Sequence, residues 1–350
     1  MLGRRSPARL RAICWRRNVS IALSFGVNIR SNAIAPYANT DHGAGRGDRG
    51  ASEETIGLVL GFAGVLAFSV SLPATRVAVR ELGVLFVSFG RAVVAGALAI
   101  AVLVIRRVPV PARRLWPQLV LVVGGVVIGF PAFTGLALQR APAGHGAVVI
   151  GLLPAITAGL GVFRVGDRPS GRYWLFALIG AAAIIVLAIA HGTKRVAIGD
   201  VFLVAAALCA GVGYTEGAIV SRELGGWQTI SWAVVFALPL TITLALVGHH
   251  PVGFDEPITS WLSFAYLGIV SMFLGFFAWY AGLARGGIAR VSQVQLLQPI
   301  LSLVWATIFL REHLGWLTVV VALIVLVSVA GSRRSAVVTR GNEHVVVGDR

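Results

Sequence analysis

Four polar side chains recur at helical spacing along a largely apolar segment in the C-terminal part of the sequence. Ser292, Gln295, Gln298 and Ser302 follow one another at steps of three, three and four residues, which places them on one face of a helix. Their hydroxyl and amide groups donate and accept hydrogen bonds without carrying a charge. The stripe therefore predicts either a lining that binds polar groups of a small solute, or hydrogen bonds between helices.

A single cation lies inside another apolar segment. Arg91 begins the run RAVVAGALAIAVLVI, and an arginine stays protonated even when it is buried. In a lipid bilayer its guanidinium group must face protein, water or a solute. Two interpretations stay open: an anchor for an anionic substrate, or a structural tie to backbone carbonyl groups or to Glu216.

An acid and several aromatic residues complete the set of candidate binding residues. Glu216 is the candidate for proton coupling, because burial favours the neutral form of a carboxyl group; a hydrogen bond near Arg222 is the alternative. Tyr214 lies two residues before Glu216 and is a candidate substrate contact. Trp279 and Tyr280 would lie either at the membrane interface or against the substrate.

Two prolines occupy equivalent positions when the sequence is shifted on itself, Pro154 in GLLPAITAG and Pro299 in LLQPILSLV. Proline cannot donate to the carbonyl group four residues earlier, so we expect a kink, hinge or cavity wall at both positions. The sequence offers no Ser-His-Asp, paired-carboxylate or metal-ligand set, and Cys14 and Cys209 alone provide no thiolate metal site. We expect no catalytic residues, no metal and no cofactor.

The composition indicates which elements position these residues. Charged residues make up 13% of the chain and hydrophobic residues 57%, and the apolar runs approach the roughly 20 residues of a bilayer-spanning helix. Only helices or closed barrels satisfy the backbone in lipid, and these runs lack the alternation of barrel strands. We predict an all-α integral membrane protein with ten transmembrane helices, near residues 56–75, 83–105, 115–138, 143–163, 172–190, 199–220, 227–247, 258–282, 288–310 and 315–331.

The net charge of +16 does not indicate a nucleic-acid partner, because Lys and Arg lie in the tails and interhelix segments rather than on one face. They concentrate in alternate segments, such as RRVPVPARR after the second helix. The positive-inside rule then predicts a multi-pass protein of the cytoplasmic (inner) membrane with both termini in the cytoplasm. Residues 1–54 and 333–350 are predicted to be disordered tails; alternatively, the start codon is assigned too far upstream.

The sequence contains two copies of a five-helix unit. The tetrapeptide RELG occurs at residues 80–83 and again at 222–225. Because five is odd, the second copy enters the membrane upside down, and its loop GHHPVGFDEP lacks the basic residues of RRVPVPARR. We therefore predict two inverted repeats, 55–191 and 198–332. Such repeats enclose a binding site near the midplane of the bilayer.

Three segments carry a resemblance to a known family: FGRAVVAG around Arg91, AVVIGLLPAITAGLGVFRVGDRPS, and IARVSQVQLLQPILSLVWATIFLREHLG. With them the chain resembles the drug/metabolite transporter superfamily, in its EamA type with ten helices in two EamA domains. Asp167 stands where that family usually has Glu, whereas Glu312 matches the pattern. The resemblance covers about 56–332 and implies solute movement across the cytoplasmic membrane, often export, without nucleotide hydrolysis.

We therefore expect a secondary transporter, not an enzyme, that exports a small polar or amphipathic metabolite by alternating access. Arg91 and the polar stripe are expected to contact the substrate, and Glu216 to carry a proton if transport is proton-coupled. One alternative is a passive facilitator for the same class of solute. An alternative of another class is an intramembrane lipid-modifying enzyme. The oligomeric state is left open.

Overall fold

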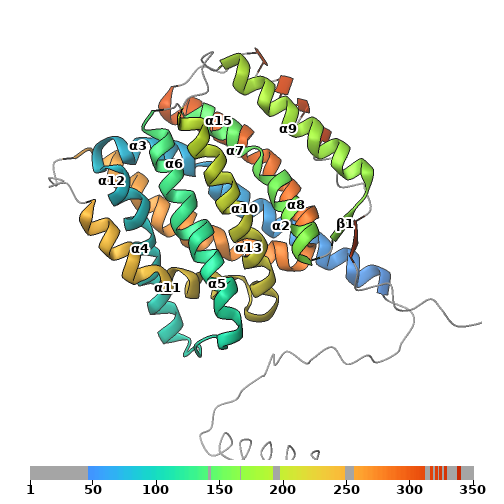
Figure 1. Ribbon diagram of the computed structural model, residues 1–350, viewed down its shortest axis with the longest axis horizontal. Helices are drawn as coiled ribbons and strands as arrows, with labels where there is room; N and C mark the ends of the chain where they lie inside the picture. The colour runs from blue at the N-terminus through green and yellow to red at the C-terminus, as the bar shows by residue number, and fades with distance from the viewer. Residues whose placement is uncertain are drawn as a thin grey trace, which may run out of the picture. The chain divides into compact units, whose positions relative to one another are not determined.

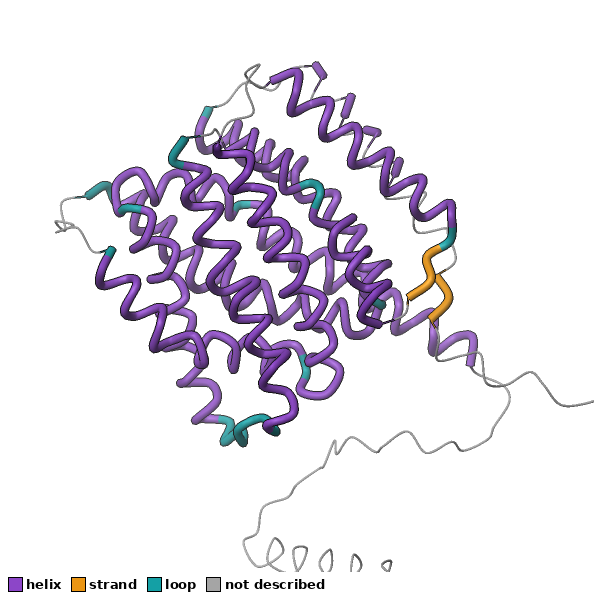
Figure 2. Tube along the Cα trace, viewed as in Figure 1, coloured by secondary structure: helices purple, strands orange, loops and turns teal. Residues whose placement is uncertain are grey.

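The computed structural model describes residues 46–140, 143–165, 167–191, 198–248, 256–311, 316–317, 320–321, 323–324, 327–328 and 337–339. These residues are helical except for turns and one pair of three-residue strands (Figures 1 and 2). Strand β1 (Asp167–Pro169) pairs antiparallel with β2 (Val337–Thr339). The prediction of an all-α protein is confirmed for the bundle. Within the C-terminal tail, β2 departs from the expected disorder because it is paired.

Seven helical segments of the described chain are long and apolar enough to cross a membrane. They correspond to the expected spans one to three and six to nine. A shorter apolar helix, Leu153–Arg164, lies in the expected fourth span. Most of the expected tenth span, 315–331, lies outside the described residues, and so does Glu312. The count of ten transmembrane helices therefore stays a prediction. Large apolar side chains such as Ile105, Phe163 and Leu178 are exposed, as a surface in contact with lipid requires.

The first repeat runs from α2 to α9. Its elements are α2 (Arg46–Ser69), α3 (Ser71–Leu82), α4 (Val84–Ile105), the short η1 (Arg113–Leu115), α5 (Trp116–Val122), the π-helical η2 (Val123–Gly129), α6 (Phe130–Leu138), α7 (Ala143–Ile150), α8 (Leu153–Val165) and α9 (Gly171–His191). Helix α2 begins inside the segment 1–54 that was expected to be a tail. Its residue Glu54 forms an ion pair with Arg290, which favours the ordered helix.

The second repeat has the same order of spans, and its first span is one continuous helix where that of the first repeat is broken. Its elements are α10 (Ile198–Leu224), α11 (Gly226–Val247), α12 (Ile258–Tyr266), the π-helical η3 (Leu267–Leu274), α13 (Gly275–Gly286), α14 (Ile288–Val291), the 3-10 helix η4 (Ser292–Leu296) and α15 (Leu297–Leu310). A π-helical segment thus lies in the middle of the third span and of the eighth. The two repeats share this uncommon feature, although no single residue type explains it.

The repeated RELG sequence forms the same corner twice. Gly83 lies between α3 and α4 with φ 79° and ψ 152°, and Gly225 lies between α10 and α11 with φ 84° and ψ 153°. A side chain would be strained at these positive φ angles, whereas glycine has no Cβ. The sequence match therefore records a backbone requirement at the same turn in both copies.

The two repeats pack against each other in matched pairs of helices. Helix α4 packs along α11, which joins the second span to the seventh. Helix α3 of the first span packs on α12 of the eighth, and α10 of the sixth packs on α5 and α6 of the third. Helices α7 and α8 meet α15 and η4 in the same way. The largest group of buried apolar side chains draws on both repeats, so the core lies at their interface.

Glycines allow α2 and α13 to approach backbone to backbone. A Cβ atom on Gly282 would lie 2.7 Å from the Gly61 nitrogen, and one on Gly57 would lie 2.5 Å from the Gly286 nitrogen. Small residues permit this close packing of membrane helices. The contact also presses the backbone of Trp279 against α2, and so fixes where its side chain enters the core.

Three prolines lie next to irregular helix geometry. The fourth span is interrupted by a turn before Pro154, and the ninth is a 3-10 helix until just before Pro299. These are the two positions at which the sequence predicted kinks; a hinge role for them stays a prediction. A further break, which the sequence analysis missed, separates α2 from α3 at Val70 and precedes Pro73.

Candidate functional site

The four residues of the polar stripe are buried, on η4 and α15. The two ends of the stripe bond to backbone: Ser292 Oγ donates to the Ala289 carbonyl at 3.1 Å, and Ser302 Oγ donates to the Ser69 carbonyl at 2.6 Å. In the middle, Gln295 Nε2 donates to Gln298 Oε1 at 3.2 Å. The stripe therefore faces the bundle. Its first end bonds within its own helical segment, and its last end bonds to the first span.

The hydrogen bond from Ser302 replaces a backbone hydrogen bond that is missing at the helix break in the first span. Pro73 has no N–H, so it leaves the Ser69 carbonyl, four residues earlier, without its helical donor. Ser302 supplies that donor from the other repeat. Trp305 Nε1 also donates to Ser69 Oγ, at 2.9 Å. A proline in the middle of an apolar run was the available signal for this contact.

Arg91 lies on α4 with only 3% of its surface exposed. Its Nε atom has no hydrogen-bond partner among the described residues. Of the open interpretations, the tie to Glu216 is wrong, because the carboxylate of Glu216 binds Arg164 instead. Helix η3 packs closely on this part of α4: a Cβ atom on Gly268 would lie 3.2 Å from the Arg91 carbonyl oxygen.

Tyr214 on α10 connects Arg91 with the polar stripe. The side chains of Gln295 and Arg91 both lie close enough to the Tyr214 hydroxyl to act on it electrostatically. Tyr214 is itself buried. The three side chains come from α4, α10 and η4, so both repeats contribute to the group.

Aromatic rings surround Tyr214 on its other sides. The ring centroid of Trp279 lies 5.3 Å away at an interplanar angle of 62°, and that of Phe276 lies 6.0 Å away. Phe68 of α2 stacks at 6.4 Å and 11°. We call this group the Tyr214 site; its members are Phe68, Arg91, Tyr214, Phe276, Trp279 and Gln295.

Trp279 and Tyr280 are both fully buried, so their placement at the membrane interface is wrong. The reason is the glycine contact between α2 and α13, which turns this part of α13 into the core. Tyr280 is satisfied: its hydroxyl donates to the Gly213 carbonyl at 3.0 Å, and its ring fills the space above Gly217. Trp279 Nε1 has no hydrogen-bond partner among the described residues.

Three buried polar atoms of the Tyr214 site thus lack partners within the described chain: Arg91 Nε, Trp279 Nε1 and Gln295 Oε1. Two more such atoms, Gln118 Oε1 and Trp232 Nε1, belong to α5 and α11 outside this group. An unsatisfied buried polar group costs about 1–3 kcal/mol. Three of the five such atoms belong to the Tyr214 site, and each is a donor or acceptor that a bound molecule could satisfy.

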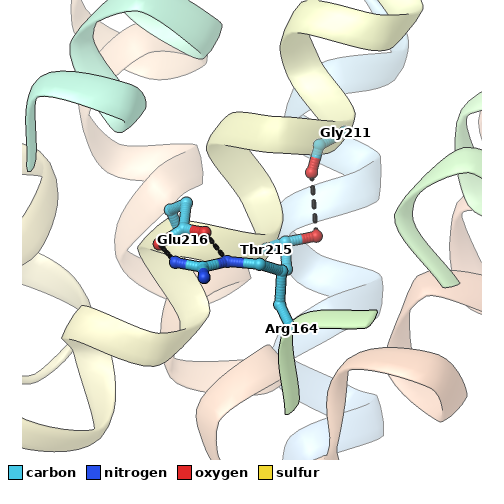
Figure 3. A network of polar contacts seen from close by, with 4 residues as sticks. All are labelled: Arg164, Gly211, Thr215 and Glu216. Atoms are coloured by element: carbon cyan, nitrogen blue, oxygen red, sulfur yellow. Dashed lines mark hydrogen bonds and ion pairs between the residues drawn. The ribbon is translucent and has the colours of Figure 1, made fainter. Parts of the chain in front are cut away.

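Glu216 lies elsewhere on α10 and forms a bidentate ion pair with Arg164, near the end of α8 (Figure 3). Arg164 Nε and Nη2 donate to its two carboxylate oxygens at 2.5 and 3.0 Å. The carboxylate is buried, whereas half of the Arg164 side chain is exposed. The neighbouring Thr215 Oγ1 donates to the Gly211 carbonyl, so its hydroxyl is used within α10. The sequence analysis missed Arg164, although a basic residue ending an apolar span was a usable signal.

Two further ion pairs join the repeats. Arg114 in η1, just before α5, binds Glu223 at the end of α10 through two bonds of 2.6 and 3.0 Å. Arg290 on α14 binds Glu54 on α2. As with Arg164 and Glu216, one partner of each pair comes from the first repeat and one from the second. The described residues contain no group of three His, Cys, Asp or Glu side chains that could hold a metal.

Comparisons with known proteins agree with this architecture. The model of the EamA-like transporter family matches residues 55–189 and 197–334. The chain is 45% identical over 285 residues to the uncharacterized transporter YdeK of Bacillus subtilis, covering 81% of this chain and 99% of that protein. It is 27% identical over 256 residues to a probable terminal-alkyne amino-acid exporter of Streptantibioticus cattleyicolor, covering 71% and 83%.

A crystal structure of another protein shares the fold, with a TM-score of 0.65 at 21% identity over 80% of this chain and 96% of that one. The family match confirms the resemblance to the drug/metabolite transporter superfamily. A family of membrane transporters acts on small solutes in a lipid bilayer, which agrees with the apolar helices. The chain belongs to the EamA-like transporter family.

Proposed function

We propose that this transporter exports a small organic acid with an apolar body by alternating access, and that the substrate binds in the Tyr214 site. This narrows the expected class of small polar or amphipathic metabolites. The observation that carries the proposal is the set of three unpartnered polar atoms, of Arg91, Trp279 and Gln295, in a group built by both repeats. In inverted-repeat transporters the interface between repeats is where substrate binds.

The chemistry of the three atoms suggests the groups of the substrate. Arg91 Nε and Trp279 Nε1 are donors, and a carboxylate accepts two such bonds, with the arginine as countercharge. Gln295 Oε1 is an acceptor and suits a hydroxyl or amino group on the substrate. The rings of Phe68 and Phe276 offer an apolar wall. The probable exporter of Streptantibioticus cattleyicolor is named for an amino-acid substrate. An amino acid has both a carboxylate and an amino group.

The three ion pairs between the repeats support alternating access. Arg114, Arg164, Glu223 and Glu216 lie near helix ends that the charge distribution predicts to be cytoplasmic, and so do Arg290 and Glu54. The conformation is then closed on the cytoplasmic side. The exposed pair of Arg114 and Glu223 contributes only about 0–1 kcal/mol. The pair of Arg164 with the buried Glu216 carboxylate is the stronger tie, and opening on this side has to break it or neutralise it.

In this proposal residues 55–191 and 198–332 are the two halves that exchange conformations, in a cytoplasmic membrane with both termini inside. Glu216 remains the proposed coupling residue, because protonation would neutralise it and release Arg164. A passive facilitator would need no such step. A pH gradient across the membrane distinguishes the two mechanisms.

Purified protein in liposomes tests the proposal. Metabolites that change in cells overproducing the protein are first identified, and the acids among them are then offered to proteoliposomes with and without a pH gradient. We expect saturable movement of at least one carboxylate, and no movement of its methyl ester. The transport proposal fails if none of the altered solutes moves. The acid class alone fails if the ester moves equally well.

A further inference from the structure

One corner of the molecule combines exposed arginines with exposed apolar side chains. It lies between α4 and α5, and its sequence is RRVPVPARRLW. Four arginines point outward there: Arg106, Arg107, Arg113 and Arg114. Ile105, Val110 and Trp116 are exposed beside them. We call residues 105–116 the basic corner.

The arginines of the basic corner differ in their partners. Arg114 binds Glu223, whereas in the described part of the chain no acidic partner appears for the other three. The Arg113 guanidinium lies 5.9 Å from the centroid of the Trp116 ring, and Trp116 Nε1 donates to the Pro111 carbonyl. This arrangement holds the cation and the indole on the same side of the turn. Three positive charges are therefore available to an anion from outside the protein.

The neighbouring surface restricts what that anion can be. Val104 and Ile105 end an apolar membrane-crossing helix, and the next apolar segment starts at Arg113. The basic corner thus lies where a bilayer changes from acyl chains to headgroups. An occupant must offer negative charge and, beside it, apolar surface for Ile105, Val110 and Trp116. A phospholipid with a net negative headgroup offers both.

We propose that the basic corner binds the headgroup of an anionic phospholipid. Arg107 and Arg113 contact the phosphate, and Trp116 packs on the glycerol and upper acyl region. The equivalent corner of the second repeat has the sequence GHHPVGFDEP, without arginine or lysine. The inverted repeats therefore present opposite charge at their two equivalent corners, and only one suits this lipid.

The lipid would also act on the contact between the repeats. Arg114 belongs to the basic corner and to the ion pair with Glu223 of α10. A phosphate that attracts Arg114 competes with that carboxylate. Anionic lipid is thus expected to loosen one of the ties that hold the two repeats together on this side.

The experiment measures lipid binding to the full-length protein in detergent, by native mass spectrometry with phosphatidylglycerol and with phosphatidylethanolamine. Each juxtamembrane arginine is worth about 1 kcal/mol on an anionic surface, which is about fivefold in affinity. We expect phosphatidylglycerol to bind more tightly than phosphatidylethanolamine, and R107Q/R113Q to lose about 30-fold. The matched control is R80Q/R140Q, which removes one exposed arginine from the last turn of α3 and one from the turn after α6, and is expected to stay within twofold of the unchanged protein.

Other outcomes overturn the proposal. Equal binding of the two lipids, or an equal loss in both double variants, shows that the basic corner does not select an anionic headgroup. Displacement of the lipid by millimolar inorganic phosphate would instead make it a site for a free anion. The variant Glu223→Gln is a second test of the same site. It removes the carboxylate that binds Arg114, so the freed arginine should strengthen phosphatidylglycerol binding several-fold. No change, or a weakening, contradicts the assigned competition. Unaltered melting temperatures in phosphatidylethanolamine show that the variants are folded.

Discussion

Arg91 and Arg164 both lie in apolar helices of the first repeat, but their surroundings differ. Arg164 is half exposed, and two of its nitrogens bind the carboxylate of Glu216 at 2.5 and 3.0 Å. Arg91 is 3% exposed, and its Nε has no partner in the described chain. The half-exposed arginine is paired by a carboxylate of the protein, whereas the buried arginine has an Nε atom that no described residue meets.

This difference distinguishes a structural residue, Arg164, from a candidate substrate-binding residue, Arg91. Arg164 joins α8 to α10 and needs nothing further for its charge. A buried charge without a partner raises the free energy of the folded state, so Arg91 is a liability in this conformation unless a ligand or water meets it. We infer that folding alone does not explain Arg91, whereas it does explain Arg164.

The same substitution at both positions tests the comparison, and the largest effect is expected at Arg91. Arg91→Met replaces arginine with an unbranched apolar side chain and so removes the positive charge. A hydrogen bond between a charged donor and a carboxylate contributes up to about 3 kcal/mol, so transport kcat/KM should fall by about 100-fold. The melting temperature should stay the same or rise, because an unpaired buried cation is removed. Proteoliposome transport and thermal unfolding measure the two quantities. A lower melting temperature with intact transport would make Arg91 a structural residue.

Arg164→Met should show the opposite pattern with a smaller effect. It leaves the buried carboxylate of Glu216 without its partner, at a cost of about 1–3 kcal/mol, discounted because Arg164 is half exposed. We expect a lower melting temperature and a less than tenfold change in transport. The double variant Arg164→Met with Glu216→Gln should regain most of the stability, because no buried charge then remains. Transport lost as completely as in Arg91→Met would remove the distinction between the two arginines.

Much of the fold could be predicted from the sequence. Apolar runs without alternation predicted helices, and the two RELG segments predicted a repeat whose glycines, Gly83 and Gly225, have nearly the same φ and ψ. The break at Val70 was missed, because Pro73 has no counterpart in the second repeat: Thr215 stands there, and α10 is continuous. A feature that only one repeat has leaves no match in the other repeat, so the repeated sequence does not indicate it.

The site was predicted less completely, and the misses share a physical cause. Arg91 and the polar stripe were identified because each is costly in lipid. For Trp279 and Tyr280 the sequence left the membrane interface and the substrate as alternatives, since aromatic side chains suit both environments and composition does not choose between them. Their burial depends on the glycine contact between α2 and α13, which is not local in sequence. The partner of Glu216 was missed for the same reason.

The smallest expected effect concerns the Ser69 carbonyl, which lacks its helical donor because of Pro73. It tests whether a polar group left free by one helix is stabilised by a hydrogen bond from another. Ser302→Ala removes the side-chain donor to this carbonyl, which Pro73 cannot replace, and should cost about 1 kcal/mol. Pro73→Ala restores an N–H four residues later, so Ser302→Ala should cost less in that background. A double-mutant cycle on the free energy of unfolding measures the coupling, expected at roughly 0.5–1 kcal/mol. Strict additivity would mean that Ser302 does not replace the helical donor, and that the break at Val70 has another origin. A measured coupling would show that a backbone acceptor left free by a proline in one repeat is met by a donor of the other, whereas the three unpartnered atoms around Tyr214 have no such donor or acceptor in the described chain and are the ones that a substrate is expected to meet.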